Sequence, residues 1–250
     1  RHYSVSISRV VIFMCGRFTL QTSLMTLGEH FLFDVPADIT LAPRFNISPT
    51  HSIATLVWNQ GQRHYGRMHW GLIPRWAADN SMAGKMINAR SETIREKPSF
   101  RGPYQRQRCL ILADGYYEWK PDGSSKQPVY IHHKTHQPFA FAGLWETWTP
   151  PQAQQETTPW WTTTIITTDA NELTKNLHHR MPVILSPRDY DAWLDPNTTD
   201  LEYLHQILVQ PSEQNQMESF VMTPVSTRVN SVKNDDPDCI KPSSTQQELF

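Results

Sequence analysis

The stretch from Cys109 to Lys120, CLILADGYYEWK, decides the fold class. It contains the continuous apolar run Cys109–Ala113, a polar Asp-Gly pair and then the aromatic run Tyr116–Lys120. Short apolar or aromatic runs bounded by turn residues are typical of β-strands, so this stretch predicts two successive strands. Alternation along the second strand puts Glu118 on the same face as Tyr116.

Similar runs recur along the chain, separated by prolines and polar turns. The pattern predicts six further strands: Ile53–Trp58, Arg67–Leu72, Val129–His132, Phe139–Leu144, Thr162–Thr168 and Phe220–Pro224. Helical patterns are fewer and predict these helices: Ser23–Phe33, Ser91–Lys97, Ala170–Asn176, Pro187–Leu194 and Asp200–Leu208. We therefore expect a single α+β domain, in which the strands form a curled or barrel-like mixed sheet and the helices are peripheral.

Composition limits the class of function. The chain has 250 residues, 38% of them hydrophobic, and a formal net charge of −1, which indicates neither a membrane span nor a globally basic nucleic-acid binder. The charge is uneven, however. Residues 85–108 hold seven Lys or Arg against two Glu, whereas residues 186–250 hold four basic and eleven acidic side chains. The basic segment predicts either a local basic surface or an ordinary solvated helix and loop.

The three cysteines, at positions 15, 109 and 239, include no CxxC pair, and no secretory signal precedes them. This usage favours a reducing compartment. We interpret residues 1–14 as a leader or a misassigned start, residues 15–233 as the domain and residues 234–250 as a flexible tail.

Cys15 follows Met14 directly, so a start at Met14 with loss of that methionine would make Cys15 the N-terminus. An N-terminal cysteine carries an amine with a reference pKa of about 7.7–8.0 and a thiol with one of about 8.5. Such a 1,2-aminothiol captures an aldehyde first as an imine and then as a thiazolidine ring. An internal cysteine offers only its thiol. Taken alone, a small buried and inert cysteine is the commoner case.

Three polar residues stand in apolar or aromatic contexts: Asn88, Glu118 and His178. A buried glutamate between aromatics has a raised pKa, which suits a proton shuttle, whereas an exposed one would do nothing. His178 is a candidate acid or base, or it caps a helix end. We expect no metal and no cofactor, because neither the histidines at 132, 133 and 136 nor those at 178 and 179 accompany a cysteine pair or HExxH motif.

Six motifs, taken in order, resemble the successive motifs of the SOS-response-associated peptidase (SRAP) family. They are MCGRF (14–18), RFNISP (44–49), WGLIP (70–74), INARSET (87–93), ADGYYEW (113–119) and HHRMP (178–182). The closing PVS (224–226) and VN (229–230) fit as well. Each motif is weak alone, but the ordered set spans most of the chain.

The resemblance implies a protein that recognises abasic sites in single-stranded DNA and links itself to them through an N-terminal cysteine. Cys15 would be the nucleophile, Asn88 would orient the sugar or the amine, Glu118 would move protons, and His178 would assist sugar ring opening. It also implies autocatalytic release of Cys15 from the preceding residues. Replication-fork proteins are candidate partners, no membrane is involved, and the expected location is the bacterial cytoplasm with action at the nucleoid.

DNA contacts follow from the same resemblance and from spacing. Candidate contacts are Arg17, Arg90 and Arg180 with phosphates, Trp70 and Trp76 with bases, and Thr167 with the sugar phosphate. Each arginine stands two residues beyond a predicted catalytic residue. Pro98 stands near the place where some members of the family offer an arginine to the DNA, so Lys97 or Arg101 would substitute.

Two other classes of function stay open at this point. One is a cysteine peptidase that acts on other proteins through Cys15 and His178, which needs no free amine. The other is a non-catalytic single-strand binder that uses the arginines and tryptophans.

Overall fold

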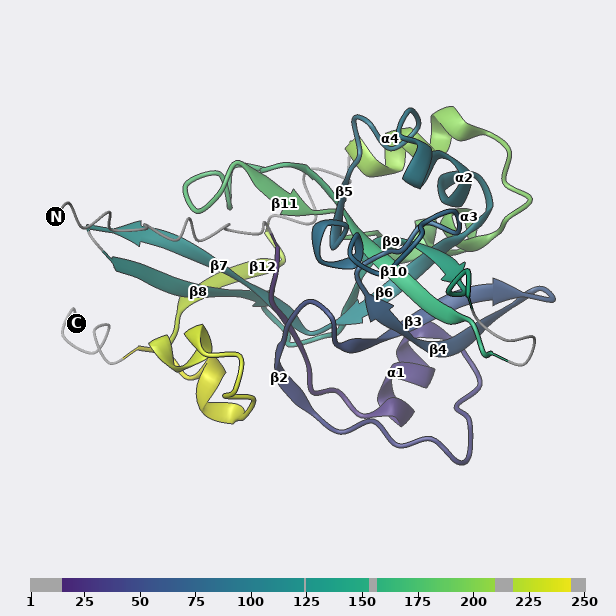
Figure 1. The fold of residues 1–250 in the computed structure, drawn as a ribbon. Helices are drawn as coiled ribbons and strands as arrows, with labels where there is room; N and C mark the ends of the chain where they lie inside the picture. The colour runs from purple at the N-terminus through teal and green to yellow at the C-terminus, as the bar shows by residue number, and fades with distance from the viewer. Residues whose placement is uncertain (1–14, 124, 153–156, 210–217, 244–250) are drawn as a thin grey trace, which may run out of the picture.

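The computed structural model describes residues 15–123, 125–152, 157–209 and 218–243 (Figure 1). Its strands form two sheets, one of seven strands and one of five. Helices lie at the periphery, so the predicted α+β class is confirmed.

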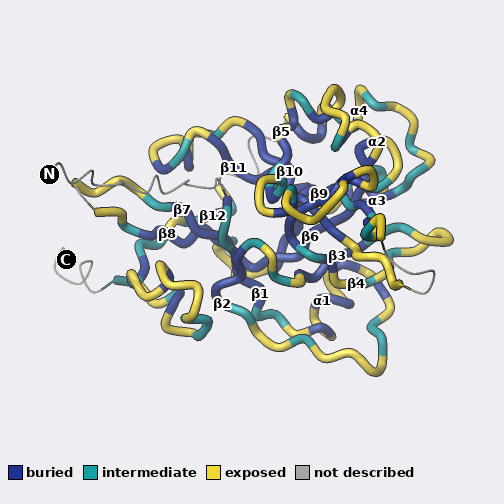
Figure 2. Tube along the Cα trace, in the orientation of Figure 1, coloured by how far each residue is buried: buried dark blue, intermediate teal, exposed yellow. Residues whose placement is uncertain are grey.

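Five strands of the larger sheet close into a barrel. They are β3 (Ser52–Asn59), β4 (Gln62–Trp70), β6 (Arg108–Ala113), β9 (Phe139–Trp148) and β10 (Trp160–Asp169). Strand β10 closes the ring because it pairs in parallel with β4 on one edge and antiparallel with β9 on the other. β6 contributes six consecutive buried residues, and β9 and β10 are also buried along most of their length, whereas β4 is buried only at Met68 and Trp70 (Figure 2). The predicted barrel-like sheet is confirmed.

Two short strands extend β10 beyond the barrel. β5 (Asn88–Arg90) pairs with it in parallel, and β11 (Arg180–Pro182) pairs with it antiparallel. Arg90 therefore lies opposite Thr167 on one edge of β10, and Arg180 lies opposite Asp169 on the other. The motifs INARSET (87–93) and HHRMP (178–182) therefore lie on either side of the end of β10.

The smaller sheet has the order β12, β8, β7, β1, β2. These strands are β12 (Phe220–Pro224), β8 (Ser125–His133), β7 (Gly115–Asp122), β1 (Phe18–Leu20) and β2 (Arg44–Ile47). Because Phe18 pairs with Tyr116 of β7, the residues just before β1 are brought beside Glu118.

The chain passes from the barrel into the smaller sheet at Asp114 and Gly115. Asp114 accepts hydrogen bonds from the backbone N–H groups of Gln21 and Thr22, which fixes the segment after β1. Gly115 has no room for a side chain, because a Cβ there would lie 2.4 Å from the ring of Tyr130. Close packing of β7 on β8 therefore requires glycine at this position.

The predicted helices are only partly confirmed. α1 (Leu24–Phe31) begins at its N-cap Ser23, whose side chain accepts from Thr26 N–H. η2 (Pro187–Asp189) with α3 (Tyr190–Leu194), and α4 (Leu201–Val209), also lie where they were expected. Among the described residues, no helix is long and apolar enough to cross a membrane.

Two predicted helices are wrong and one helix was missed. Residues 91–97 form turns, because Lys97 is held extended by the proline that follows it, and α2 (Pro98–Arg106) begins only there. Residues 170–176 also form turns, in which the Asn171 side chain accepts the N–H of Thr174 and so competes with helix formation. The short 3-10 segments are η1 (Ala83–Lys85), η3 (Thr227–Asn230) and η4 (Pro237–Ile240).

The expected flexible tail is partly wrong. Residues 234–243 pack against the domain: Asn46 Nδ2 donates to Asn234 O at 2.6 Å, and Cys239 is fully buried. The prediction failed because polar residues here bond to backbone groups of β2 instead of to solvent. Residues 244–250 and the expected leader, 1–14, lie outside the described residues.

Candidate functional site

Cys15 and Glu118 are in direct contact. Cys15 lies just before β1 and is 2% exposed, and Glu118 on β7 is 5% exposed. The backbone N–H of Cys15 donates to Glu118 Oε1 at 3.1 Å. Cys15 has a φ of 44°, a left-handed conformation that is uncommon outside glycine. The backbone nitrogen, and not only the thiol, is thus directed at the carboxylate.

The surroundings tune the acidity of both groups. Burial raises the pKa of Glu118 to about 7, and the hydrogen bond from Cys15 offsets part of that rise. Burial, and secondarily the nearby Glu118 carboxylate, raises the pKa of the Cys15 thiol well above its usual value. Near neutral pH the carboxyl can therefore both accept and release a proton, whereas the thiol stays protonated.

Tyr116 shares the face of β7 that carries Glu118, as the alternation predicts. It is 2% exposed, and burial followed by Cys15 and Glu118 raises the pKa of its hydroxyl. The resemblance did not single out Tyr116. The alternating pattern of the strand was the signal that could have found it.

His178 lies in the turn before β11, and its ring is held by its own neighbours. Its Nδ1 accepts the backbone N–H of Arg180 at 3.0 Å, so the neutral ring carries its proton on Nε2. Burial, and secondarily His179, lowers the pKa of His178, which makes the ring neutral near pH 7. No described hydrogen bond joins His178 to Cys15 or Glu118. Asn88 is half-buried at the start of β5, opposite Ile165 of β10.

Two of the predicted DNA contacts are corrected by burial. Trp70 is fully buried, and its indole N–H donates to Ile87 O, so the ring belongs to the core and cannot stack on a base. Thr167 is also fully buried, and its hydroxyl faces Ala89 O instead of the surface. Trp76, by contrast, is 59% exposed.

The three arginines differ sharply in their surroundings. Arg180 is 5% exposed and already ion-paired, with Glu92 at 2.5 Å and Asp169 at 2.7 Å, so its guanidinium is not available as an open phosphate fork. Arg17 is half-buried and bonded to protein groups. Arg90 is exposed, and its side chain has no hydrogen bond or ion pair with another described residue.

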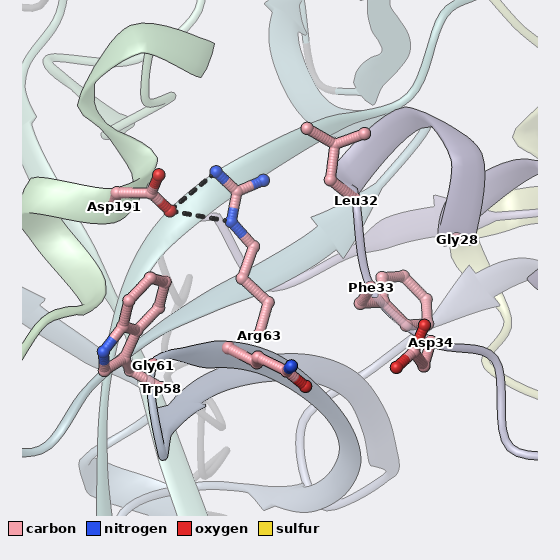
Figure 3. A pocket seen from close by; sticks show the side chains of 9 residues that line it. Gly28, Leu32, Phe33, Asp34, Trp58, Gly61, Arg63 and Asp191 are labelled. Carbon is pink, nitrogen blue, oxygen red and sulfur yellow. Dashed lines mark hydrogen bonds and ion pairs between the residues drawn. The ribbon is translucent and has the colours of Figure 1, made fainter.

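Within the described parts of the chain, no three His, Cys, Asp or Glu side chains converge to hold a metal. A cavity of about 470 Å³ opens between the end of α1, the β3–β4 hairpin and α3 (Figure 3). Arg63 crosses it and is bonded to Asp191, and none of the predicted site residues lines it.

The fold and the site define a class: a protein with a buried cysteine, set before the first strand of a two-sheet α+β domain and paired through its main chain with a glutamate. Comparison with known sequences gives the family. The profile described as SOS response associated peptidase (SRAP) matches residues 14–232, and the chain belongs to this family.

Several relatives match over nearly their whole length. The abasic site processing protein YoqW of Bacillus subtilis is 45% identical over 231 residues, which cover 91% of this chain and 99% of the relative. The abasic site processing protein YedK of Escherichia coli is 30% identical over 92% of this chain and 100% of its own. A crystal structure of a protein from Bacteroides thetaiotaomicron matches with a TM-score of 0.78 and 25% identity, covering 92% of this chain and 100% of that one.

Proposed function

We propose that the protein captures abasic sites in single-stranded DNA as a covalent adduct of Cys15, once the residues before Cys15 are absent. The observation that carries this proposal is the contact between Cys15 N and Glu118 Oε1 at 3.1 Å. It directs the group that would become the α-amine at a carboxyl whose pKa is raised to about 7. Membership of the SRAP family, and the names of relatives such as YoqW and YedK, support the same substrate.

The chemistry is balanced without a cofactor. The ring-opened abasic sugar presents an aldehyde, to which the Cys15 amine adds with loss of one water to give an imine. The sulfur then adds to the same carbon, and the thiol proton passes to the nitrogen, which closes a thiazolidine. Reversal consumes one water.

Each neighbouring side chain has a role in this scheme. Glu118 takes the proton that the amine must lose and returns it to the departing oxygen. His178, neutral with its proton on Nε2, assists ring opening of the sugar, and Asn88 orients the sugar or the amine. Arg90 holds a flanking phosphate, and exposed Trp76 replaces Trp70 as the residue that stacks on a base.

Residues 1–14 would block this chemistry, because Cys15 then has an amide instead of an amine. Two routes free it: translation from Met14 with loss of that residue, or hydrolysis of the Met14–Cys15 bond at this site. The second route uses Cys15, Glu118 and His178 as a processing site and consumes one water.

A cysteine peptidase that acts on other proteins is less well supported. Such an enzyme needs an activated thiolate, and therefore a thiol with a lowered pKa. Burial and Glu118 both raise the pKa of the Cys15 thiol. The environment favours an amine-first reaction over a thiolate-first reaction.

The test compares four proteins with single-stranded DNA that contains one abasic site. The protein that begins at Cys15 should give an adduct that survives denaturation, and Cys15→Ala should give none. Cys15→Ser and Cys15→Ala both keep the α-amine but lack the thiol that closes the ring, so borohydride should trap the imine of each as a stable product. The chain with residues 1–14 intact should not react. The absence of any adduct with the protein that begins at Cys15 would rule out the proposal.

A further inference from the structure

We propose that Arg17 is a positioning residue, which together with Asn46 fastens a C-terminal clasp, residues 226–243, over the start of the chain and so holds Cys15 against Glu118. The inference rests on the proposed function for its catalytic meaning. Sequence spacing predicts instead that Arg17 binds a phosphate. The contacts of Arg17 distinguish the two roles.

Arg17 is engaged by protein groups at both its main chain and its side chain. Its Nη1 donates to Asn46 Oδ1 at 2.7 Å and to Val229 O at 2.9 Å. Its guanidinium lies 5.6 Å from the centre of the Trp119 ring. Its carbonyl accepts the N–H of Tyr117 at 3.0 Å. The side chain is thus fixed toward the protein interior and not toward solvent.

Asn46 joins β2 to the clasp and is fully buried. Its Nδ2 donates to three clasp carbonyls, those of Val229, Ser231 and Asn234, at 3.2, 3.0 and 2.6 Å. Its main-chain N–H donates to Asp235 Oδ1 at 2.8 Å. Removal of this amide takes the donor from Ser231 O and Asn234 O, whereas Val229 O keeps its bond from Arg17, so we expect substitution of Asn46 to loosen the clasp.

A third connection reaches β7. Trp119, the residue after Glu118, donates its indole N–H to Asn230 Oδ1 of the clasp at 2.7 Å. The clasp therefore touches the segment before β1 through Arg17, β2 through Asn46 and β7 through Trp119. These contacts fix the strand that carries Glu118 relative to the segment that carries Cys15.

The clasp matters because the active form of Cys15 would be a chain end. Chain termini are poorly ordered unless they are tied down, and only Gly16 separates Cys15 from Arg17. A misplacement of about 1 Å can cost roughly 100-fold in rate where catalysis depends on geometry. Arg17 is the anchor nearest to the nucleophile, whereas the exposed guanidinium of Arg90 has no partner among the described residues, as a phosphate ligand requires.

The decisive experiment separates rate from affinity in the protein that begins at Cys15. Arg17→Met should lower the adduct rate at saturating abasic DNA by roughly 10- to 100-fold. It should leave the Kd for undamaged single strands, and its salt dependence, unchanged. Arg90→Met, the matched comparison, should weaken binding and reduce the slope of log K against log salt by about 0.7.

Two further variants address folding and coupling. Arg17→Lys keeps the charge but not the planar group over Trp119, so it should still slow the saturated rate severalfold. Asn46→Ala should slow the rate in the same way, and the double variant Arg17→Met with Asn46→Ala should be little slower than either single variant. Thermal melting at the assay pH identifies variants that are folded.

A second readout needs no DNA. Iodoacetamide labelling followed by mass should modify Cys15 at least tenfold faster in Arg17→Met, and Cys239 in the clasp should also label faster. Cys109, buried in the barrel, should label at the original rate. Unchanged labelling of Cys15, or an Arg17→Met variant that behaves like Arg90→Met, would overturn the inference. If Cys15 labels faster in Arg17→Met but the unsubstituted protein that begins at Cys15 forms no adduct, the result would support the clasp and refute the proposed function.

Discussion

At the residue scale, the feature that the fold tunes is the carboxyl of Glu118. The strand pattern brings Glu118 to the inner face of β7, and burial there raises its pKa to about 7. The pKa of the Cys15 thiol is raised as well, whereas the nucleophilic thiol of a cysteine peptidase has a lowered pKa. The reactivity of Cys15 toward an aldehyde therefore depends on its nitrogen and on the contact of that nitrogen with Glu118.

The raised pKa predicts how stability responds to pH in the chain that retains residues 1–14. The folded state holds a proton on Glu118 up to about pH 7, whereas the unfolded chain releases it near pH 4.5, so stability should fall as pH rises through this window. Glu118→Gln keeps an acceptor for Cys15 and removes the ionisation. It should be more stable than the wild type by about 2–3 kcal/mol at pH 8, and nearly equal at pH 4.

Urea denaturation at both pH values measures this difference. The matched variant Glu172→Gln alters an exposed carboxylate and should change stability by less than about 0.5 kcal/mol at either pH. A Glu118→Gln variant with the pH dependence of the wild type would show that Glu118 is ionised at low cost in the folded protein.

At the element scale, the longer strands could be predicted because their signal is local, whereas the short strands β1, β2, β5 and β11 were missed. Runs such as Cys109–Ala113 and Phe220–Pro224 are apolar and bounded by turn residues, and each is a strand. The helix at Pro98–Arg106 was missed because Pro103 and a glycine interrupt its pattern, and its stability comes from tertiary contacts. Arg108 supplies those contacts, and nothing near it in sequence indicates its distant partners.

We expect replacement of Arg108 to lower the stability of the protein strongly. It is 1% exposed and donates to the carbonyls of Tyr104, Gln105, Trp193 and Asp195, which ties the ends of α2 and α3 to the barrel. Arg108→Met leaves these carbonyls without their donor and should cost about 3 kcal/mol or more. Urea denaturation should give less than about 0.5 kcal/mol for Arg106→Met, an exposed neighbour. Similar losses for both variants would contradict the tying role.

At the scale of the whole molecule, the candidate site is assembled from distant parts of the chain. Cys15 precedes β1 of the smaller sheet, Glu118 lies on β7, and Asn88 and His178 flank the extension of β10 beyond the barrel (Figure 1). The order of motifs predicted the family, which is confirmed. It could not predict that Trp70 and Thr167 are buried or that Arg180 is ion-paired, because those outcomes depend on how the two sheets pack.

The uneven charge leads to a prediction about the whole DNA path. Lys97 and Arg101 stand exposed at the start of α2 and have no described ion pair, so they are suited to phosphates on the strand beyond Arg90. Replacing both with glutamine should weaken binding equally for intact and abasic strands, and should reduce the slope of log K against log salt by about 0.7 for each phosphate that is no longer neutralised. The saturated adduct rate should not change, since neither residue touches the reacting atoms.

Lys175 and Lys241 are the matched controls for this experiment, because each is already paired with a carboxylate three residues away. Replacing both with glutamine removes the same formal charge as the double replacement of Lys97 and Arg101, called here the α2 variant. A purely global charge effect would therefore lower the salt slope equally in the two proteins. A reduction of the slope confined to the α2 variant would trace the DNA along α2. Equal reductions would mean that binding depends on net charge instead of on a defined path.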